Sequence, residues 1–193
     1  KSKTSSNKDD YATVKYNSSL VQQWVKTVDQ SGKNDRATGV WIDASNNVYV
    51  TGRSSNGNDY DYLTIKYLAA NGANGWSQPK LFDSNGDDIA TDITGSANEV
   101  VVTGTKFNGV QMDIQTIAYN LSTGAQIWST AYANANGKDE HANHIAIGQN
   151  DEVAVSGAVD ISTNNISDNN ILVLRYNNAG VLLRTTINGG GAN

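Results

Sequence analysis

One short motif appears four times in this sequence and limits what the chain can fold into. It reads YATVKY at Tyr11–Tyr16, and related versions stand at Tyr62–Tyr67, Ile114–Tyr119 and Ile171–Tyr176. The tyrosines that close the four motifs are separated by 51, 52 and 57 residues. A period of about 50 residues built from strands is typical of radial or stacked repeat folds. Such a repeat describes a scaffold and does not name a ligand.

The apolar runs alternate with a period of two residues, which indicates strands and not helices. In the first motif, Ala12, Val14 and Tyr16 share one face, while Thr13 and Lys15 share the other. Val, Ile, Thr and Tyr dominate the runs, as in half-buried strands. The connections are rich in Asn, Gly, Asp and Ser, which suit tight turns. The sequence therefore predicts an all-β protein.

Each complete repeat unit contains four such runs. They are 37–42, 48–52, 62–67 and the segment around Trp76; 90–94, 100–104, 114–119 and 127–128; and 142–147, 153–157, 171–176 and 181–183. Two further runs, 11–16 and 24–25, precede them. Four antiparallel strands per unit, repeated around an axis, form a β-propeller blade. We expect one propeller domain, visible as a half blade at 1–34 and blades at 35–87, 88–138 and 139–193.

The position of certain residues in the unit predicts their roles. Small residues in the first run suit the crowded innermost strand of a blade. The fourth run contains Trp24, Trp76 or Trp128, and we expect these rings to pack between neighbouring blades. An acid, which is Asp35, Asp88 or Glu140, stands two residues before an alanine of the first run. We expect these acids to accept hydrogen bonds from backbone amides where the chain enters a blade.

At these positions the chain resembles the bacterial SBBP-type β-propeller repeat. That repeat reads approximately Asp-x-Ala, an apolar strand, Asp-x-x-Asn-x-Val-Tyr-Val-Thr-Gly, a strand ending in Lys-Tyr, and a strand with Trp. The match is best at Asp35–Ala37, Asp43–Asn47, Val48–Gly52 and Tyr62–Tyr67. The resemblance implies a secreted or cell-surface bacterial protein. It brings no catalytic motif with it.

Three and a half blades of this size cannot close a ring. An open ring would expose the faces and edges of its end sheets. We therefore expect the remaining blades to come from further chain or from a partner chain. The alternative, a stacked β-solenoid, usually has about 20 to 30 residues per coil.

Composition excludes some classes of partner. The net charge is −5 and lysines and arginines do not cluster, so we expect no nucleic-acid partner. No run approaches the roughly 18 consecutive apolar residues of a membrane-spanning helix, so we expect no membrane insertion. The chain has no cysteine, so it has neither disulfides nor thiol chemistry.

Three segments contain residue types that could form a site. In Asp83–Asp88, Asp83, Asn85 and Asp87 place oxygen ligands at alternate positions, as a calcium loop requires, but the spacing differs from an EF-hand. We interpret the segment as a polar turn between blades and leave calcium binding open.

The other two segments are interpreted as structural. His141 and His144 are three residues apart on a strand, which predicts opposite faces and unpaired polar positions near the axis. The cluster Asn58–Tyr62 could bind a sugar or a cation, but an aspartate before the third run also appears at Asp10 and Asp113. We therefore assign no catalytic, cofactor-binding or metal-binding residue.

We predict a non-enzymatic binding or structural module, secreted or on the cell surface, that recognises a protein or a surface glycan through its loops. One alternative is a glycan hydrolase or lyase with acids near the central channel. Such an enzyme would gather perturbed carboxylates from non-equivalent positions in different blades. The other alternative is a structural repeat of a large adhesin or surface fibre. A lectin-like module would expose Trp or Tyr rings outside the interfaces between blades.

Overall fold

The computed structural model describes residues 2–3, 8–30, 32–162 and 169–189, and strands dominate all of this part of the chain. The elements are β1 (Ser2–Lys3), β2 (Asp9–Tyr16), β3 (Gln22–Val28), β4 (Asp35–Ile42), β5 (Val48–Ser55), β6 (Tyr60–Tyr67), β7 (Lys80–Phe82), β8 (Asp88–Gly95), β9 (Glu99–Phe107), β10 (Met112–Asn120), β11 (Gln126–Tyr132), β12 (Glu140–Ile147), the 3₁₀ turn η1 (Gln149–Asp151), β13 (Val153–Asp160), β14 (Asn169–Tyr176) and β15 (Leu182–Asn188). Within the described ranges, no helix is long and apolar enough to span a membrane.

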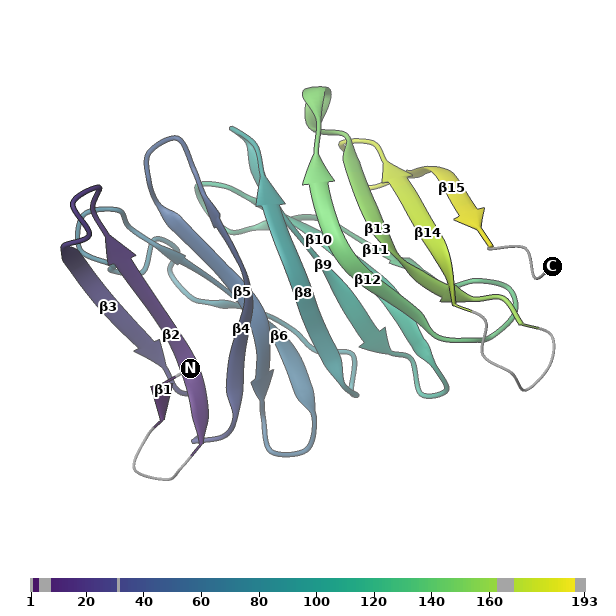
Figure 1. Cartoon of the computed structure of the whole chain (residues 1–193), viewed down its shortest axis with the longest axis horizontal. Coiled ribbons are helices and arrows are strands. Elements are labelled where there is room, and N and C mark those ends of the chain that lie inside the picture. Colours follow the sequence, from purple (N-terminus) through teal and green to yellow (C-terminus); the bar gives the residue numbers. More distant parts are fainter. Residues whose placement is uncertain (1, 4–7, 31, 163–168, 190–193) are drawn as a thin grey trace.

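The strands form antiparallel sheets in which sequence neighbours pair. Three sheets have four strands, in the orders β4-β5-β6-β7, β8-β9-β10-β11 and β12-β13-β14-β15. A three-stranded sheet, β1-β2-β3, precedes them. The sheets stand side by side in chain order, with β1–β3 at one end of the row and β12–β15 at the other (Figure 1). The predicted all-β propeller fold is confirmed: each four-stranded sheet is a blade, and β2 and β3 correspond to the third and fourth strands of the others.

The hydrophobic core is divided among the interfaces between consecutive sheets. Three clusters of buried side chains fill the three interfaces. The first joins Tyr11 and Trp24 of the half blade to strands β5 and β6 of the next sheet. Because β6 and β10 each have neighbours on both sides, nearly all of their side chains are buried.

An aromatic contact between a tryptophan and a tyrosine of the next blade appears at all three interfaces, tilted at the first two and stacked at the third. The ring of Trp24 lies 5.8 Å from that of Tyr67, and the pairs Trp76–Tyr119 and Trp128–Tyr176 are each separated by 6.1 Å. The three tryptophans are at most 7% exposed. The predicted role of these rings between blades is confirmed.

A glycine in the turn after the third strand covers each tryptophan. Gly72, Gly124 and Gly180 have φ angles of +66°, +70° and +72°. A Cβ atom added to them would lie 2.8, 2.7 and 2.5 Å from the nearest indole atom. These turns therefore need glycine for two reasons: the left-handed backbone, and the close approach of the tryptophan of the preceding blade.

A β-bulge interrupts the first strand of every blade. The register shifts between Ala37 and Gly39, between Ala90 and Asp92, and between Ala142 and His144. The extra residue reverses the alternation of faces. His141 and His144 consequently both lie on exposed positions, with the buried Ala142 and Ile145 on the other face. The prediction of opposite faces was wrong because simple alternation takes no account of a bulge.

The bulge also explains the glycine that ends the second-strand motif Val-Tyr-Val-Thr-Gly. A Cβ atom on Gly52 would lie 2.1 Å from the carbonyl oxygen of Arg36 and 2.7 Å from the hydroxyl of Tyr11. Gly104 has the same relation to Ile89 and Tyr62, at 2.1 and 2.6 Å. Only glycine leaves room here for both the bulged strand and the tyrosine of the preceding blade.

Replacing Gly124 with alanine should test the glycine–tryptophan contact. We expect G124A to lower the free energy of unfolding by about 3 kcal/mol, combining backbone strain and overpacking. The matched control is Gly32, which has a φ of +63° and nothing within 4 Å of an added Cβ. G32A should cost only the strain, about 1 kcal/mol. Urea denaturation measures both, and equal losses would contradict the proposed contact.

Candidate functional site

Polar side chains of the repeat converge on a backbone carbonyl of the following blade. The oxygen of Leu121 accepts hydrogen bonds from Lys66 Nζ at 2.8 Å, Trp76 Nε1 at 3.2 Å and the hydroxyl of Tyr49 at 3.3 Å. One interface earlier, the oxygen of Ala69 accepts from Lys15 Nζ at 2.9 Å and from Trp24 Nε1 at 3.2 Å.

The lysine of the YATVKY motif therefore has a structural role. Burial lowers the pKa of Lys66, and Asp43 opposes that shift. The opening tyrosine of the motif also crosses the interface: Tyr11 donates to the carbonyl of Leu63 at 3.0 Å, and Tyr62 to that of Gln115 at 3.2 Å. Burial raises the pKa of both tyrosines well above the usual range. Both hydroxyls thus remain hydrogen-bond donors between blades.

Acidic side chains gather at two consecutive interfaces in the same arrangement. Asp10, Asp29 and Asp35 each offer a carboxylate oxygen within 4.8 Å of the others. Asp61, Asp83 and Asp88 do the same one repeat later. We call these groups the first and second acidic triads. Each contains an acid at the start of a third strand, an acid just after a fourth strand, and the first residue of the next blade.

The structure regroups the residues of Asp83–Asp88, the segment considered as a candidate calcium loop. Asp83 lies with Asp61 and Asp88. The carboxylate of Asp87 instead accepts a hydrogen bond from the Tyr60 amide at 3.1 Å. The amide of Asn85 donates to Asp83 Oδ1 at 2.7 Å, and Asn85 has a φ of +66°. The linker is therefore a turn in which Asp83 faces acids from two other strands. Sequence spacing could not reveal this, because the partners are about 20 residues apart or lie across a blade boundary.

The acids at the blade entries accept the predicted hydrogen bonds from backbone amides. Asp35 Oδ2 accepts from the Gln30 amide at 2.7 Å, and Asp88 Oδ2 from the Ser84 amide at 2.6 Å. Glu140 accepts from the backbone amide of Asn134, and the side-chain amide of the same residue donates to its Oε1.

Burial is the main cause of the raised pKa values of these carboxyl groups. It raises the pKa of Asp35 and Asp88, and it raises that of Glu140 to about 7. Burial, with further contributions from Asp83 and other acids, raises the pKa of Asp61 to about 6. Away from the triads, burial and Asp151 raise the pKa of Glu99 to about 7.

The third interface lacks the acid that follows the fourth strand at the other two interfaces. Ala133 follows β11 at the place where Asp29 and Asp83 follow their fourth strands. Asp113, the acid at the start of the third strand, accepts two hydrogen bonds from Asn108 Nδ2, each 2.9 Å, and one from Gln111 Nε2 at 3.2 Å. Neutral donors thus satisfy Asp113 without a third carboxylate.

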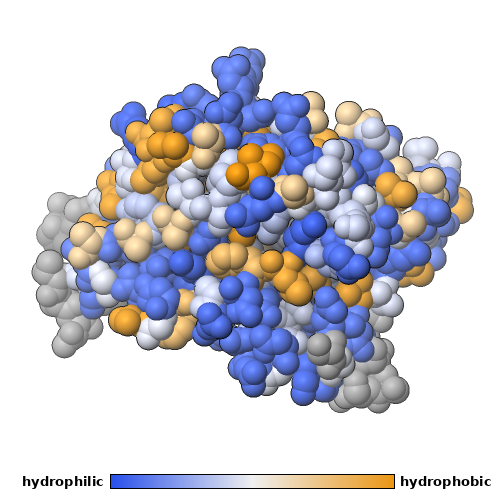
Figure 2. All heavy atoms as spheres, turned by 180° about the vertical axis from the view of Figure 1, so that it is seen from behind, coloured by the Kyte–Doolittle hydropathy of each residue, from blue (hydrophilic) through white to orange (hydrophobic). Residues whose placement is uncertain are grey.

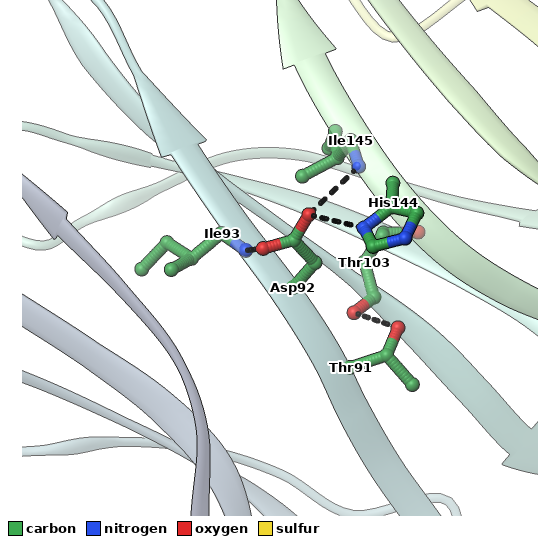
Figure 3. A network of polar contacts seen from close by, with 6 residues as sticks. All are labelled: Thr91, Asp92, Ile93, Thr103, His144 and Ile145. Carbon is green, nitrogen blue, oxygen red and sulfur yellow. Dashed lines mark hydrogen bonds and ion pairs between the residues drawn. The ribbon is translucent and has the colours of Figure 1, made fainter.

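The two histidines are not brought together as a site. Figure 3 shows His144 beside Asp92 of the preceding blade, where Nδ1 and Oδ2 are 3.5 Å apart. The same Oδ2 accepts the Ile145 amide at 3.1 Å, and Oδ1 accepts the Ile93 amide at 2.9 Å. Asp92 therefore connects the innermost strands β8 and β12. His144, predicted to be an unpaired polar position, has a partner.

The side chains of Asn58–Tyr62, the candidate cluster for binding a sugar or a cation, do not converge on one point in the structure. Asp59 and Asp61 both accept hydrogen bonds from Asn56. The guanidinium of Arg53 lies 4.4 Å from the centre of the Tyr60 ring, and Tyr62 is buried in the interface. The two tyrosines thus have different neighbours and do not face one ligand.

A groove lies between the half blade and the first complete blade. It has a volume of about 270 Å³ and is lined by Ala12, Thr13, Val14, Ala37, Thr38, Gly39, Val40 and Val50. Val14 and Val40 are 40% and 62% exposed. On the face of the molecule opposite to that of Figure 1, apolar side chains form small groups among hydrophilic ones (Figure 2). The groove thus combines small apolar side chains with an open end of the row of sheets.

Comparisons with known proteins give neighbours at low similarity. No family model and no curated protein matches the chain. The crystal structure of BamB from Moraxella catarrhalis is similar to 86% of this chain over 55% of its own, with 13% identity and a TM-score of 0.45. A structure of the eukaryotic initiation factor is similar to 93% of this chain over 43% of its own, with 11% identity and a TM-score of 0.46. The chain thus spans about half the length of these structures, and the propeller assignment rests on its own sheets.

The raised pKa values of Glu99 and Glu140 predict how stability depends on pH. The folded pKa of each is about 7, above the value near 4.3 of an unfolded chain. The unfolded state therefore loses its protons first, and the free energy of unfolding should fall as pH rises from about 4.5 to about 7. Above pH 7 this loss is complete.

The variants E99Q and E140Q should each flatten this dependence, and the double variant should flatten it most. Glutamine keeps the shape of the side chain and cannot ionise. Urea denaturation at several pH values between 4.5 and 8 measures the slope. A slope equal to that of the parent protein in both variants would contradict the assignment.

Proposed function

We propose that this protein is a non-enzymatic β-propeller module that binds a polypeptide by strand addition at the edge of β2. The observation that carries the proposal is the open edge of β2 beside the apolar groove. In a complete blade, β6 pairs with β5 along its whole length, from Tyr60–Ser55 to Tyr67–Val48. On the corresponding edge of β2, β1 pairs only with Asp9 and Asp10 among the described residues.

An edge of this kind is a template for another strand. Its backbone amides and carbonyls can pair with an added chain, and this pairing gives affinity without a special side chain. The neighbouring groove supplies selectivity, because Ala12 and Val14 on one side and Ala37, Val40 and Val50 on the other leave room for small apolar side chains. A partner strand with alternating valine or alanine fits these dimensions.

The occupant that fits best is a β-hairpin with the pattern of β4–β5, supplied by another repeat unit of the same or a partner chain. The support is the repeat itself. β2 has the motif of β6. The third strand of each complete blade (β6, β10 or β14) pairs with a second strand that resembles Val-Tyr-Val-Thr-Gly. Such a hairpin would complete the half blade and continue the row of sheets.

The positions of the polar and aromatic residues favour this function over the alternatives. Three of the five described carboxyl groups with a raised pKa, Asp35, Asp88 and Glu140, occupy equivalent positions in successive blades, whereas an enzyme would draw its acids from non-equivalent positions. Trp24, Trp76 and Trp128 are buried between blades and offer no ring to a sugar, whereas Tyr16 at the end of β2 is 55% exposed. The open edge of β2 supports a protein partner over a glycan, because backbone pairing needs no exposed aromatic ring. The resemblance to bacterial SBBP-type repeats supports a secreted or cell-surface location.

A labelled peptide with the sequence of residues 35–55 tests the proposal. We expect it to bind the protein, as measured by fluorescence anisotropy, and a scrambled peptide not to bind. The variants V14K and V40K should each weaken binding roughly tenfold or more, because a buried valine contributes about 1.5 kcal/mol or more and a buried lysine is unfavourable.

The matched control is V110K, since Val110 is 84% exposed on a loop outside the groove. This variant should bind the peptide like the parent protein. Binding that is equal in V14K, V40K and V110K would refute the proposed edge, as would equal binding of the scrambled peptide.

A further inference from the structure

The two acidic triads contain buried carboxylate oxygens that no hydrogen bond satisfies. In the first triad, Asp10 and Asp35 are 2% and 0% exposed, and Oδ1 of each is buried with no hydrogen-bond partner. In the second triad, Asp61 is 6% exposed and its Oδ1 is in the same situation. Buried carboxylate oxygens normally have partners, because removing a charge from water is costly unless it is paired. Asp35 has the hydroxyl of Ser54 and the amide of Ser55 as nearby donors, so the oxygens left without a donor are Oδ1 of Asp10 and Oδ1 of Asp61.

Basic side chains near the first triad have other partners. The ammonium group of Lys8 donates to the carbonyl of Gly32 at 2.5 Å. The ion pairs found among the described residues, Asp92–His144 and Glu152–Arg175, include no member of either triad. The negative charge of each triad is thus gathered at one point; in the second triad, Lys106, which lies opposite Asp88 on β9, offsets part of it.

The arrangement has the chemistry of a site for a hard divalent cation. Calcium takes oxygen ligands at about 2.3–2.6 Å, so two ligands on opposite sides of one ion are at most about 5 Å apart. The triad oxygens meet this limit, since they lie within 4.8 Å of one another. Calcium requires six to eight oxygens, and water can supply the others because one acid of each triad, Asp29 or Asp83, is exposed.

Solvent can reach the second triad from its side. A pocket of about 110 Å³ is lined by Asp61 together with Ser54, Asn56 and three other residues. An ion could enter there without disrupting the core between the blades. Asn56 lines the same opening and donates its side-chain amide to Asp61 Oδ2 at 3.1 Å.

The third interface lacks one acid of the triad. It has Ala133 in place of the exposed acid, and amide groups of Asn108 and Gln111 satisfy Asp113. Oε2 of Glu140 is nevertheless buried there without a hydrogen-bond partner. The grouping of three carboxylates around unpartnered oxygens, and not an unpartnered oxygen alone, therefore sets the first two interfaces apart.

We propose that each acidic triad binds one divalent cation, with calcium preferred over magnesium, and that the ion fastens one blade to the next. In the first triad the ion would join β2 and the end of β3 to the start of β4. In the second it would join β6 and the end of β7 to the start of β8. Magnesium fits less well, because it requires near-ideal octahedral geometry at shorter distances.

Calorimetric titration of the EDTA-treated, buffer-exchanged protein with calcium chloride tests the proposal. We expect two calcium ions per chain, and a melting temperature that rises with calcium more than with the same concentration of magnesium. The variants D10N and D61N should each bind one ion, and the double variant none. The double variant should also lose the calcium-dependent rise in melting temperature.

The matched control is D87N, which removes an acid from the same linker but outside the triads. It should still bind two ions. If any aspartate variant binds poorly, its melting temperature in EDTA separates loss of the site from loss of folding; we expect that temperature to equal or exceed the parent value, because asparagine removes charge repulsion. The proposal fails if the parent protein shows no binding heat at millimolar calcium, or if D10N and D61N retain both ions.

Discussion

The contact of a tryptophan with a glycine and a tyrosine of the next sheet is the interaction on which the arrangement of this protein depends. A single four-stranded sheet has two faces to cover, and no helix covers either face in the described part of the chain. The neighbouring sheets do so instead, and the indole fixes how closely they approach. Since Gly72, Gly124 and Gly180 leave no room for a Cβ, the contact between the glycine and the indole sets the spacing between blades. The other contacts between blades form at that spacing.

Several residues of types that are common in binding sites instead belong to these interfaces between blades. Lys66 and Trp76 donate to one carbonyl of the following blade, and the hydroxyl of Tyr62 donates to another. A lysine, a tyrosine and a tryptophan at a repeated position would suit a binding site equally well. Their burial and their backbone partners show that they hold blades together. The acidic triads share the location, and Oδ1 of Asp10 and Oδ1 of Asp61 are buried there without a hydrogen-bond partner.

The sequence was a good guide wherever a role depends on position in the repeat. The strand order, the packing of Trp24, Trp76 and Trp128, and the hydrogen bonds of Asp35 and Asp88 all follow from the period and were confirmed. The orientation of His141 and His144 was predicted wrongly, because a bulge changes the alternation without a clear signal in the residue types. The grouping of Asp83 was missed for another reason: its neighbours come from a different strand and from the next blade.

The sequence by itself determined the repeat, the four strands of each unit and the residues that face inward, since alternation and turn chemistry act over a few residues. Only the tertiary structure decided which polar groups meet. Asp61 and Asp88 lie 27 positions apart in the sequence and approach within 4.8 Å only when one blade packs on another. Local rules of the chain cannot specify such neighbours, which depend on how whole sheets pack.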